Sequence, residues 1–357
     1  MDIYNGIRRK SKKVKVGRLY IGGDAPLTVQ SMTNVRGYEE NYRQMKALEE
    51  AGCDIIRMTV PDMDAVRVLA RLKESDLTMP IVADIHFDYR MAIESCAAGA
   101  DKVRINPGNI GDEGRVKEVV RAAKNAGIAI RVGVNSGSLE KGKRDKFGGV
   151  TPEALAESAL ENVRLLEKYD FDDIVVAVKS SSPYKMAAAN RLIAGRCPYP
   201  LHLGVTEAGT ARMGVTKGAA GIGGLLLSGI GDTLRVSLTA DPVKEVEAGR
   251  QILDALGFGS MKLTLVSCPT CGRTKIDIIS IAERFEEEAK KIALKRPVKV
   301  AVMGCAVNGP GEAGDADFGI AGGVGEAVFF KNGKIERKIP EDGLVEALIA
   351  ELKKYAE

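Results

Sequence analysis

Three cysteines and one glutamate near the C-terminal end of the sequence are the residues best suited to chemistry. Cys268 and Cys271 lie in SCPTCGR, and Cys305 begins the stretch CAVNGPGE, which ends at Glu312. Two cysteines separated by two residues can turn their sulfur atoms toward one centre, and the glycine and proline around them shape tight turns. This spacing predicts a metal or redox centre.

Three kinds of centre fit such a pair of cysteines. A thioredoxin-like redox pair needs a βαβ setting, which this motif lacks. A zinc ribbon needs a second pair of ligands, but the segment offers only Cys305 and no histidine, so zinc stays an open alternative. An iron–sulfur cluster on three thiolates is favoured, and its fourth iron could take a carboxylate. Glu312 is the nearest carboxylate in the sequence, with Asp315 and Asp317 as weaker alternatives.

The other cysteines, the apolar segments and the charge of the chain limit the classes of protein to which it could belong. Cys53, Cys96 and Cys197 are interpreted as small buried thiols. No apolar run is long enough to cross a membrane, and the N-terminal segment lacks the apolar core of a secretion signal, so we expect a cytoplasmic protein. The net charge is only +4, aromatic residues make up 5% and tryptophan is absent. These values do not favour a nucleic-acid partner.

A second chemical signal is a set of cations inside or directly after segments that read as buried strands. They are Arg57 in DIIRMTV, Arg104 in KVRIN, Arg131 in IAIRVGV, Arg235 in TLRVSL and Lys179 after DIVVAV. A buried guanidinium is costly unless it is paired. If these side chains converge, the natural partner is a polyanion, because arginine can grip a phosphate with two parallel hydrogen bonds.

Polar side chains that could share this site follow the same strands: Asn34, Asp84, His86, Asn106, Asn135, Thr206, Glu207 and Ser237. His86 follows its strand in ADIHFD and is expected at the same end as the cations. His202 lies early in its strand and is expected to be structural. The Asp-x-His pattern alone is a weak indication of a metal.

Alternating strands and helices must position these residues. Eight strands are predicted at 27–32, 54–60, 81–85, 102–106, 128–134, 173–178, 201–206 and 233–238. Amphipathic helices are predicted at 39–52, 112–127 and 151–169, the last with Thr151 as N-cap and Pro152 at its first position. Eight strand–helix units in this length predict an α/β fold, a (β/α)8 TIM barrel, with a doubly wound open sheet as the alternative.

The alternation stops near residue 258. We expect residues 1–258 to form the substrate-binding TIM barrel and residues 259–357 to form a smaller α+β domain that carries the cluster. This second domain is predicted to contain the strands KLTLV and VKVAVM, a long helix between them, the ribbon EAVFFKNGKIERKI and a final helix. A barrel for an anion and a domain for a redox centre together imply a reductive step on a phosphate ester.

These motifs resemble a known family. The segments are VQSMTN, ADIHFD, RINPGN, GVNSGSLE, VKSSSP, GVTEAG and GDTLRVSLT, followed by CPTCG and GCAVNGPGE. Together they are similar to the bacterial 4-hydroxy-3-methylbut-2-enyl diphosphate synthases of the non-mevalonate isoprenoid pathway. The resemblance covers nearly the whole chain and fits the two-domain bacterial form.

The resemblance implies an iron–sulfur oxidoreductase that opens the ring of 2-C-methyl-D-erythritol 2,4-cyclodiphosphate and removes a hydroxyl group with two electrons. It implies a [4Fe–4S] cluster, and its ligands would be Cys268, Cys271, Cys305 and Glu312. The implied substrate contacts are Arg57, Arg104, Arg131, Asn135, Lys179, Thr206, Glu207, Arg235, Ser237 and Asn308, to which Asp84 and His86 are added for their place at strand ends. Glu207 is a candidate proton donor and Glu312 a candidate exchangeable ligand.

The resemblance also implies a head-to-tail homodimer and a small electron-transfer protein, a flavodoxin or ferredoxin, as partner. The dimer has a geometric reason as well. The last barrel helix runs back from the active end, so the second domain is tethered at the opposite end of its own barrel. Two other functions fit less well. A pterin- or corrinoid-dependent methyl transferase would not need three cysteines, and an electron carrier or metal sensor would not need cationic strand ends.

Overall fold

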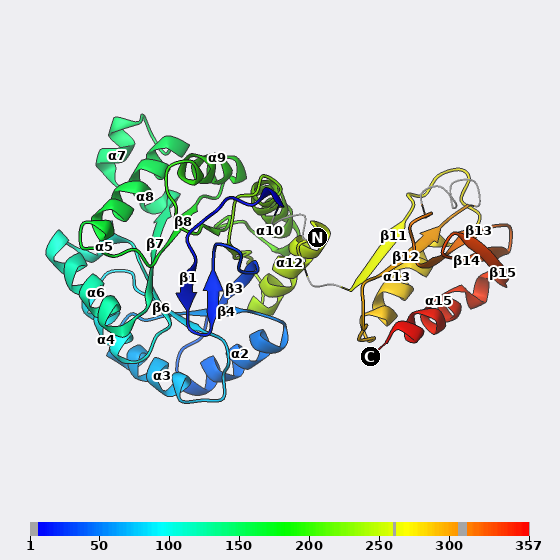
Figure 1. Cartoon of the computed structure of the whole chain (residues 1–357), viewed down its shortest axis with the longest axis horizontal. Helices are drawn as coiled ribbons and strands as arrows, with labels where there is room; N and C mark the ends of the chain where they lie inside the picture. Colours follow the sequence, from blue (N-terminus) through cyan, green and yellow to red (C-terminus); the bar gives the residue numbers. More distant parts are fainter. Residues whose placement is uncertain (1–5, 260–261, 306–312, 357) are drawn as a thin grey trace. The chain divides into compact units, whose positions relative to one another are not determined.

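The computed structural model describes residues 6–259, 262–305 and 313–356 of the chain. The chain forms two compact units, Met1–Gly259 and Ser260–Glu357 (Figure 1). The predicted residues Asn308 and Glu312 lie outside the described residues.

In the described residues, the first unit contains a sheet of eight strands. They are β3 (Thr28–Met32), β4 (Ile55–Thr59), β5 (Ile81–Asp84), β6 (Lys102–Ile105), β7 (Ala129–Asn135), β8 (Ile174–Lys179), β9 (His202–Leu203) and β10 (Thr233–Leu234). All neighbouring pairs are parallel, in the order β8-β7-β6-β5-β4-β3-β10-β9. The bridges Val176–Leu201 and Ser180–Val205 join β8 to the β9 segment and bring the two edges together. The predicted TIM barrel is confirmed.

Helices follow the strands around the outside of the barrel (Figure 1). They are α2 (Tyr38–Glu50), α3 (Met63–Lys73), α4 (Tyr89–Ala97), α5 (Pro107–Ile110), α6 (Glu113–Ala126), α7 (Lys141–Lys146), α8 (Pro152–Glu167), α9 (Pro183–Ala194), α10 (Ala211–Gly218), α11 (Gly224–Leu226) and α12 (Pro242–Ala255). The Thr151 side chain accepts from the backbone N–H of Ala154 and caps α8, as predicted. No helix in the described ranges is long and apolar enough to cross a membrane.

Strands β9 and β10 are shorter than the sequence predicts, because their carboxyl-terminal halves leave the regular ladder. The N–H of Arg235 still donates to Leu203 O at 2.9 Å. Farther along, the N–H of Leu238 donates to the side chain of Glu245 on α12. The Glu245 side chain thus takes the place of a neighbouring strand as acceptor for Leu238. The segments after β9 and β10 continue as loops at this end of the barrel.

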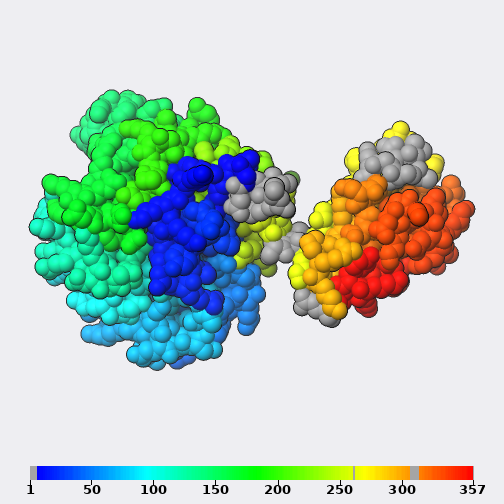
Figure 2. All heavy atoms as spheres, in the orientation of Figure 1, coloured from blue at the N-terminus to red at the C-terminus, as the bar shows by residue number. Residues whose placement is uncertain are grey.

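The other end of the barrel is closed by an N-terminal hairpin of β1 (Val14–Val16) and β2 (Leu19–Ile21). Its buried side chains pack against the first inward-facing residues of four strands, Ile55, Val82, Ala129 and Val175. The hairpin, in dark blue, lies across the middle of the first unit in Figures 1 and 2. Ligands must therefore enter at the carboxyl ends of the strands.

The second unit is a mixed sheet with helices. Its described elements are β11 (Leu263–Ser267), α13 (Ile278–Ala289), β12 (Val298–Met303), β13 (Phe318–Gly322), β14 (Glu326–Lys331), β15 (Lys334–Pro340) and α15 (Leu344–Leu352). The first two strand pairs are parallel and the last two antiparallel. Strand β13 was not predicted, because its glycines and alanine (FGIAG) give no β-branched pattern. These residues instead let the sheet pack closely, since a Cβ on Gly319 would lie 2.4 Å from Ala301 O.

Candidate active site

A cavity of about 130 Å³ opens at the carboxyl ends of the barrel strands. It is lined by Met32, Arg57, Asp84, His86, Arg104, Arg131, Gly133, Asn135, Ala177, Lys179, Thr206, Arg235 and Ser237. The structure thus brings together, around one cavity, all the sequence-predicted substrate contacts that are described, apart from Glu207. Strand alternation explains this, because Val103 and Ile105 pack outward under the helices and leave Arg104 facing inward.

Four of the cations are almost fully buried in the barrel: Arg57, Arg104, Arg131 and Lys179. Arg131 is 1% exposed and Arg57 and Lys179 are 8% and 7% exposed. Burial, and then repulsion among neighbouring cations, lowers the pKa of Arg57 to about 10. The same two causes lower the pKa values of Arg131 and Lys179 well below their ordinary values. The cluster holds more positive charge than the neighbouring carboxylates Asp84 and Glu245 neutralise, which favours an anionic ligand.

One buried carboxylate organises part of this cluster. Asp84 is 1% exposed and lies 3.0 Å from Arg104 Nη1 and 3.5 Å from Arg57 Nε. Burial opposes its ionisation, but the Arg57 and Arg104 guanidinium groups outweigh burial and hold the pKa of Asp84 below its ordinary value. Asp84 therefore stays ionised and orients two of the arginines. Arg131, by contrast, makes a long contact of 3.5 Å from Nη1 to Gln30 Oε1.

Two inward-facing glycines make room for the cations. A Cβ on Gly133 would lie 2.7 Å from Arg104 Nε, and one on Gly204 would lie 3.1 Å from Lys179 Nζ. A glycine inside a strand marks a close approach of this kind. The glycines within IAIRVGV and LHLGVT are the sequence signal that could have indicated this close approach.

We therefore expect Gly133→Ala to weaken substrate binding while the barrel stays folded. The added methyl group must push the Arg104 guanidinium away from Asp84 and the cavity. Loss of one charge-assisted hydrogen bond predicts about a 10-fold rise in KM, or ~1.5 kcal/mol. The control is Gly142→Ala, where a Cβ meets nothing within 4 Å. An unchanged KM for Gly133→Ala, with thermal stability unaltered, would contradict the packing argument.

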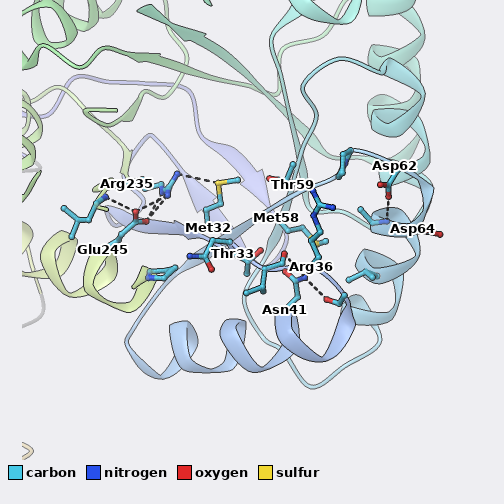
Figure 3. A pocket seen from close by; sticks show the side chains of 18 of the residues that line it. Met32, Thr33, Arg36, Asn41, Met58, Thr59, Asp62, Asp64, Arg235 and Glu245 are labelled. Carbon is cyan, nitrogen blue, oxygen red and sulfur yellow. Dashed lines mark hydrogen bonds and ion pairs between the residues drawn. The ribbon is translucent and has the colours of Figure 1, made fainter. Parts of the chain in front are cut away.

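Arg235 is held from outside the barrel by a residue that the sequence analysis missed. Glu245 on α12 is 3% exposed and accepts from Arg235 Nε at 3.0 Å and from Nη2 at 3.1 Å. It also accepts from Ser31 Oγ and from the Leu238 N–H. Figure 3 shows Arg235 between this carboxylate and the sulfur of Met32. No sequence signal pointed to Glu245, because pairing across the barrel wall depends on how α12 packs.

A second cavity, of about 660 Å³, adjoins the first and shares Met32 and Arg235 with it (Figure 3). Its wall includes Asn34, so that strand-end residue faces this neighbouring space and not the cationic cavity. Asn106 has another role, because its side chain accepts from the Gly108 N–H and caps α5. The polar residues at the strand ends therefore have different roles: some line cavities, and Asn106 caps a helix.

Glu207 follows Thr206 at the rim of the cationic cavity. It is exposed, and its backbone has φ +53°, one of three non-glycine residues with positive φ among those described. Such a conformation is costly for a residue with a Cβ and occurs preferentially at functional positions. The backbone strain is thus consistent with a side chain held for chemistry.

Two of the predicted metal ligands of the second unit lie at the ends of two neighbouring parallel strands. Cys268 directly follows β11, and Cys305 follows β12 after one glycine. The Gly304 N–H donates to Cys268 Sγ at 3.2 Å, which suits a thiolate. Cys271 is exposed, and backbone hydrogen bonding with Arg273 lowers the pKa of its thiol. All three cysteines are free.

The donor set fits an iron–sulfur cluster by its chemistry and by its place at adjacent strand ends. In the described ranges, no three Cys, His, Asp or Glu side chains are gathered closely enough to hold a metal ion. Glu312 lies outside those ranges.

Comparison with known proteins identifies the family. Residues 11–250 match the GcpE TIM-barrel domain, and residues 264–354 match the GcpE protein C-terminal domain. The chain belongs to the GcpE family. A relative from Ruminiclostridium cellulolyticum is 54% identical over 347 residues, which cover 97% of this chain and 98% of that protein. A relative from Caldanaerobacter subterraneus is 55% identical over 350 residues, 98% of each chain.

Both relatives are named 4-hydroxy-3-methylbut-2-en-1-yl diphosphate synthase (flavodoxin). The GcpE chain described here is accordingly an oxidoreductase with this synthase activity, in the isoprenoid pathway, and it belongs to a family of iron–sulfur enzymes. The prediction of family and activity from the motifs is confirmed, and the two other functions considered from sequence are set aside.

Comparison with solved structures supports the barrel fold of the first unit and nothing beyond the fold. The type I 3-dehydroquinate dehydratase of Clostridium difficile aligns with a TM-score of 0.51 at 14% identity, over 70% of this chain and 99% of that one. At such low identity the likeness concerns the fold and not the reaction.

Proposed function

We propose that the cationic cavity at the strand ends binds the diphosphate of 2-C-methyl-D-erythritol 2,4-cyclodiphosphate. The GcpE activity converts this cyclic substrate to 4-hydroxy-3-methylbut-2-en-1-yl diphosphate and water, with two electrons and a net uptake of one proton. The observation that carries the proposal is the convergence of Arg57, Arg104, Arg131, Lys179 and Arg235 on one cavity.

The cations have two tasks in this reaction. They hold the diphosphate through charge-assisted hydrogen bonds, and the planar arginine groups set its orientation. When the ring opens, a phosphate oxygen leaves carbon and takes up negative charge. Donors that already point at that oxygen stabilise the charge without rearrangement. Asp84 and Glu245 keep Arg104 and Arg235 in the required orientation.

We further propose that Glu207 delivers the proton that leaves with the hydroxyl group as water. Glu207 is exposed and directly follows Thr206, which lines the cavity, and its backbone has a φ of +53°. A carboxyl group can act as general acid when it is positioned within hydrogen-bond reach of the leaving oxygen.

Replacing Glu207 by glutamine tests this role. The amide keeps the size and hydrogen bonding of the side chain but cannot donate an acidic proton. We expect kcat to fall by about 10²–10⁴-fold with little change in KM, since general acid catalysis contributes that much. The assay uses cluster-loaded enzyme with reduced flavodoxin under anaerobic conditions, and the control is Glu118→Gln on the exposed face of α6. Full turnover by Glu207→Gln would exclude the proposed role.

The second unit supplies the ligands for the redox group in this proposal. Cys268, Cys271 and Cys305 would hold a [4Fe–4S] cluster by their thiolates, with the carboxylate of Glu312 at the fourth iron. Such a cluster, when bound, supplies low-potential electrons one at a time. Flavodoxin, which the relatives' names include, is the proposed donor to this enzyme. Ferredoxin is the alternative donor.

We also propose a head-to-tail homodimer with shared active sites. Helix α12 begins beside the cavity, where Glu245 pairs with Arg235. It ends beside the start of β4, where Arg250 pairs with Asp54 at 2.7 Å. Its 14 residues cover ~21 Å, so the chain leaves the barrel at the closed end, remote from the cavity. The seven residues 256–262 between α12 and β11 reach at most ~25 Å, little more than the length of α12, so the second unit of the partner is the better candidate to cover the cavity.

The rim around the cavity offers an apolar surface for that contact. Phe87 after β5 is 74% exposed, Tyr184 at the start of α9 is 76% exposed, and Met213 at the start of α10 is 53% exposed. All three follow the carboxyl end of a strand. Large apolar side chains exposed around one opening are typical of a surface that another protein covers.

A further inference from the structure

Beneath the cationic cavity, the barrel interior holds a layer of polar side chains that the proposed mechanism does not use. They are Thr28, Gln30, Lys102, His202 and Thr233, all between 0% and 5% exposed. Lys102 faces inward because its neighbour Val103 packs outward under the helices. In register it is paired with Val82 and Ala129, which belong to the layer that the N-terminal hairpin closes.

Several polar atoms of this layer have no hydrogen-bond partner among the described residues. They are Lys102 Nζ, His202 Nε2, Gln30 Nε2, Thr28 Oγ1 and, just above, Arg131 Nε. Buried polar atoms are nearly always satisfied, so this concentration requires an explanation. A lysine that carries its charge at such a place would suffer the largest penalty, because an isolated buried ammonium is very costly.

The charged groups around Lys102 make the ammonium form still less favourable. Arg131 on β7 and Arg57 on β4 repel it, and Asp101, just before β6, is the carboxylate that attracts it. Asp101 is already engaged by Lys73 at 2.5 Å and by the Ile81 N–H. Burial first, and then these cations, lower the pKa of Lys102 well below its ordinary value.

The other elements around the layer add no free negative charge. His202 on β9 is buried, and desolvation followed by repulsion from Arg131 and Lys179 lowers its pKa as well. Asp84 on β5, above the layer, is taken by Arg57 and Arg104. The facing side chains from β3 and β10 are uncharged.

We propose that Lys102 is a neutral amine in the substrate-free enzyme and becomes an ammonium group when the diphosphate binds above it. The step is the addition of one solvent proton to the amine, with no other bond broken. Burial and repulsion from Arg131 and Arg57 together keep the amine neutral, and negative charge on the two phosphates offsets the repulsion. Substrate binding is then linked to proton uptake. This inference rests on the proposed position of the diphosphate.

Such a linkage serves the known reaction. Ring opening frees one diphosphate oxygen, so the bound anion gains a negative charge as substrate becomes product. An ammonium group one layer below keeps that charge compensated inside the barrel without a change in the arginine positions. Lys102 therefore does not touch the substrate. It is a positioning residue whose charge acts on the bound anion through the neighbouring Arg131.

Isothermal titration calorimetry tests the inference directly. Oxidised, cluster-loaded enzyme is titrated with the cyclodiphosphate at about pH 8, above the ordinary range of a histidine. The titration is repeated in MOPS, HEPES and Tris, whose ionisation enthalpies differ, so that the slope of the binding enthalpy gives the number of protons exchanged. We expect the wild-type enzyme to take up about one proton and Lys102→Met to take up close to none. The control, Lys117→Met on the exposed face of α6, should behave as the wild type.

The outcomes distinguish a failure of the Lys102 inference from a failure of the proposed substrate site. Binding by the wild type without proton uptake overturns the inference and leaves the proposed substrate site intact. Equal uptake by wild type and Lys102→Met overturns it too, and assigns the proton to another group such as His86. Failure of the wild type to bind the cyclodiphosphate overturns the proposed site and this inference together.

Thermal unfolding provides a readout that does not depend on the ligand. The folded-state pKa of Lys102 lies below its unfolded value, so the unfolded state binds more protons in the window between them. The buried lysine therefore destabilises the fold below its ordinary pKa of about 10.4, and the penalty fades as the pH rises toward that value. We expect Lys102→Met to have a higher Tm than the wild type at pH 7 and the difference to shrink by about pH 10. A difference independent of pH would contradict the inference, and Lys102→Gln serves if the methionine variant does not fold.

Discussion

Replacing Cys305 by serine is expected to remove most of the iron and sulfide from the enzyme and to reduce its activity by at least about 100-fold. A serine hydroxyl is a far weaker ligand than a thiolate, and even loss of an outer partner of a ligand costs about 10–100-fold in metal affinity or activity. Iron and sulfide are determined on anaerobically purified protein, together with an EPR spectrum after reduction. The barrel should remain folded, since its core is separate from that of the second unit.

The matched control uses a cysteine of the barrel. Cys53, Cys96 and Cys197 are buried, and burial raises the pKa of the Cys53 and Cys96 thiols to about 12. Such thiols stay protonated and are poor ligands. Cys197→Ser should therefore retain full iron, sulfide and activity. If Cys305→Ser retained full iron and sulfide as well, the ligand assignment would have to move to another residue.

The cationic cavity could be predicted from sequence because strand periodicity is local. In a strand, alternate residues face the same side, so Arg57, Arg104 and Arg131 had to face inward once their apolar neighbours packed under the helices. The eight strands themselves followed from β-branched runs separated by amphipathic helices. The end of the barrel at which the site opens was expected because Lys179 and the polar candidate residues follow the carboxyl ends of the strands.

What the sequence analysis missed depends on contacts between distant segments. Glu245 belongs to α12 and reaches Arg235 only because that helix packs beside β10 and β3. Lys102 begins the segment KVRIN, a place where lysine is normally solvated. It is fully buried because the N-terminal hairpin, some eighty residues earlier in the chain, closes that end of the barrel. No local pattern carries such information.

In the second unit, too, the ligand residues could be predicted from sequence and the contacts between strands could not. The cysteine spacing indicated a ligand set without any structure, because ligand chemistry depends on residue type. The N–H of Gly304 that donates to Cys268 Sγ could not be predicted, since it requires β11 and β12 to be parallel neighbours in a defined register. Strand β13, which lies between β12 and β14, was not predicted, because its small residues give no strand pattern.

Two inactive variants are expected to restore each other's activity if the active site is shared between subunits. Arg131→Ala damages the barrel half of the site, because loss of its charge-assisted contacts to phosphate costs about 1.5–3 kcal/mol. Cys305→Ser damages the cluster half. When the two variants are mixed and allowed to exchange subunits, each mixed dimer combines one intact barrel with one intact cluster unit of the partner.

The expected amount follows from the statistics of exchange. Half of the randomly re-formed dimers are mixed, and each contains one complete site of two, so activity should recover to about a quarter of the wild-type value per protein. Assays at low substrate concentration keep the residual activity of Arg131→Ala small. A mixture of Cys271→Ser with Cys305→Ser is the control, because both lesions lie in the same half and no dimer contains a complete site.

The result distinguishes the shared site from a site built within one chain. In a self-contained site every Arg131→Ala chain keeps its damaged barrel and every Cys305→Ser chain its damaged cluster unit, so mixing restores nothing. Recovery therefore requires that the cavity at the strand ends of one barrel be completed by the other subunit. If mass spectrometry of the intact dimer shows that mixed dimers form and activity still does not return, the cavity must be served by the cluster unit of its own chain, and the reach of the segment after α12 must be explained another way.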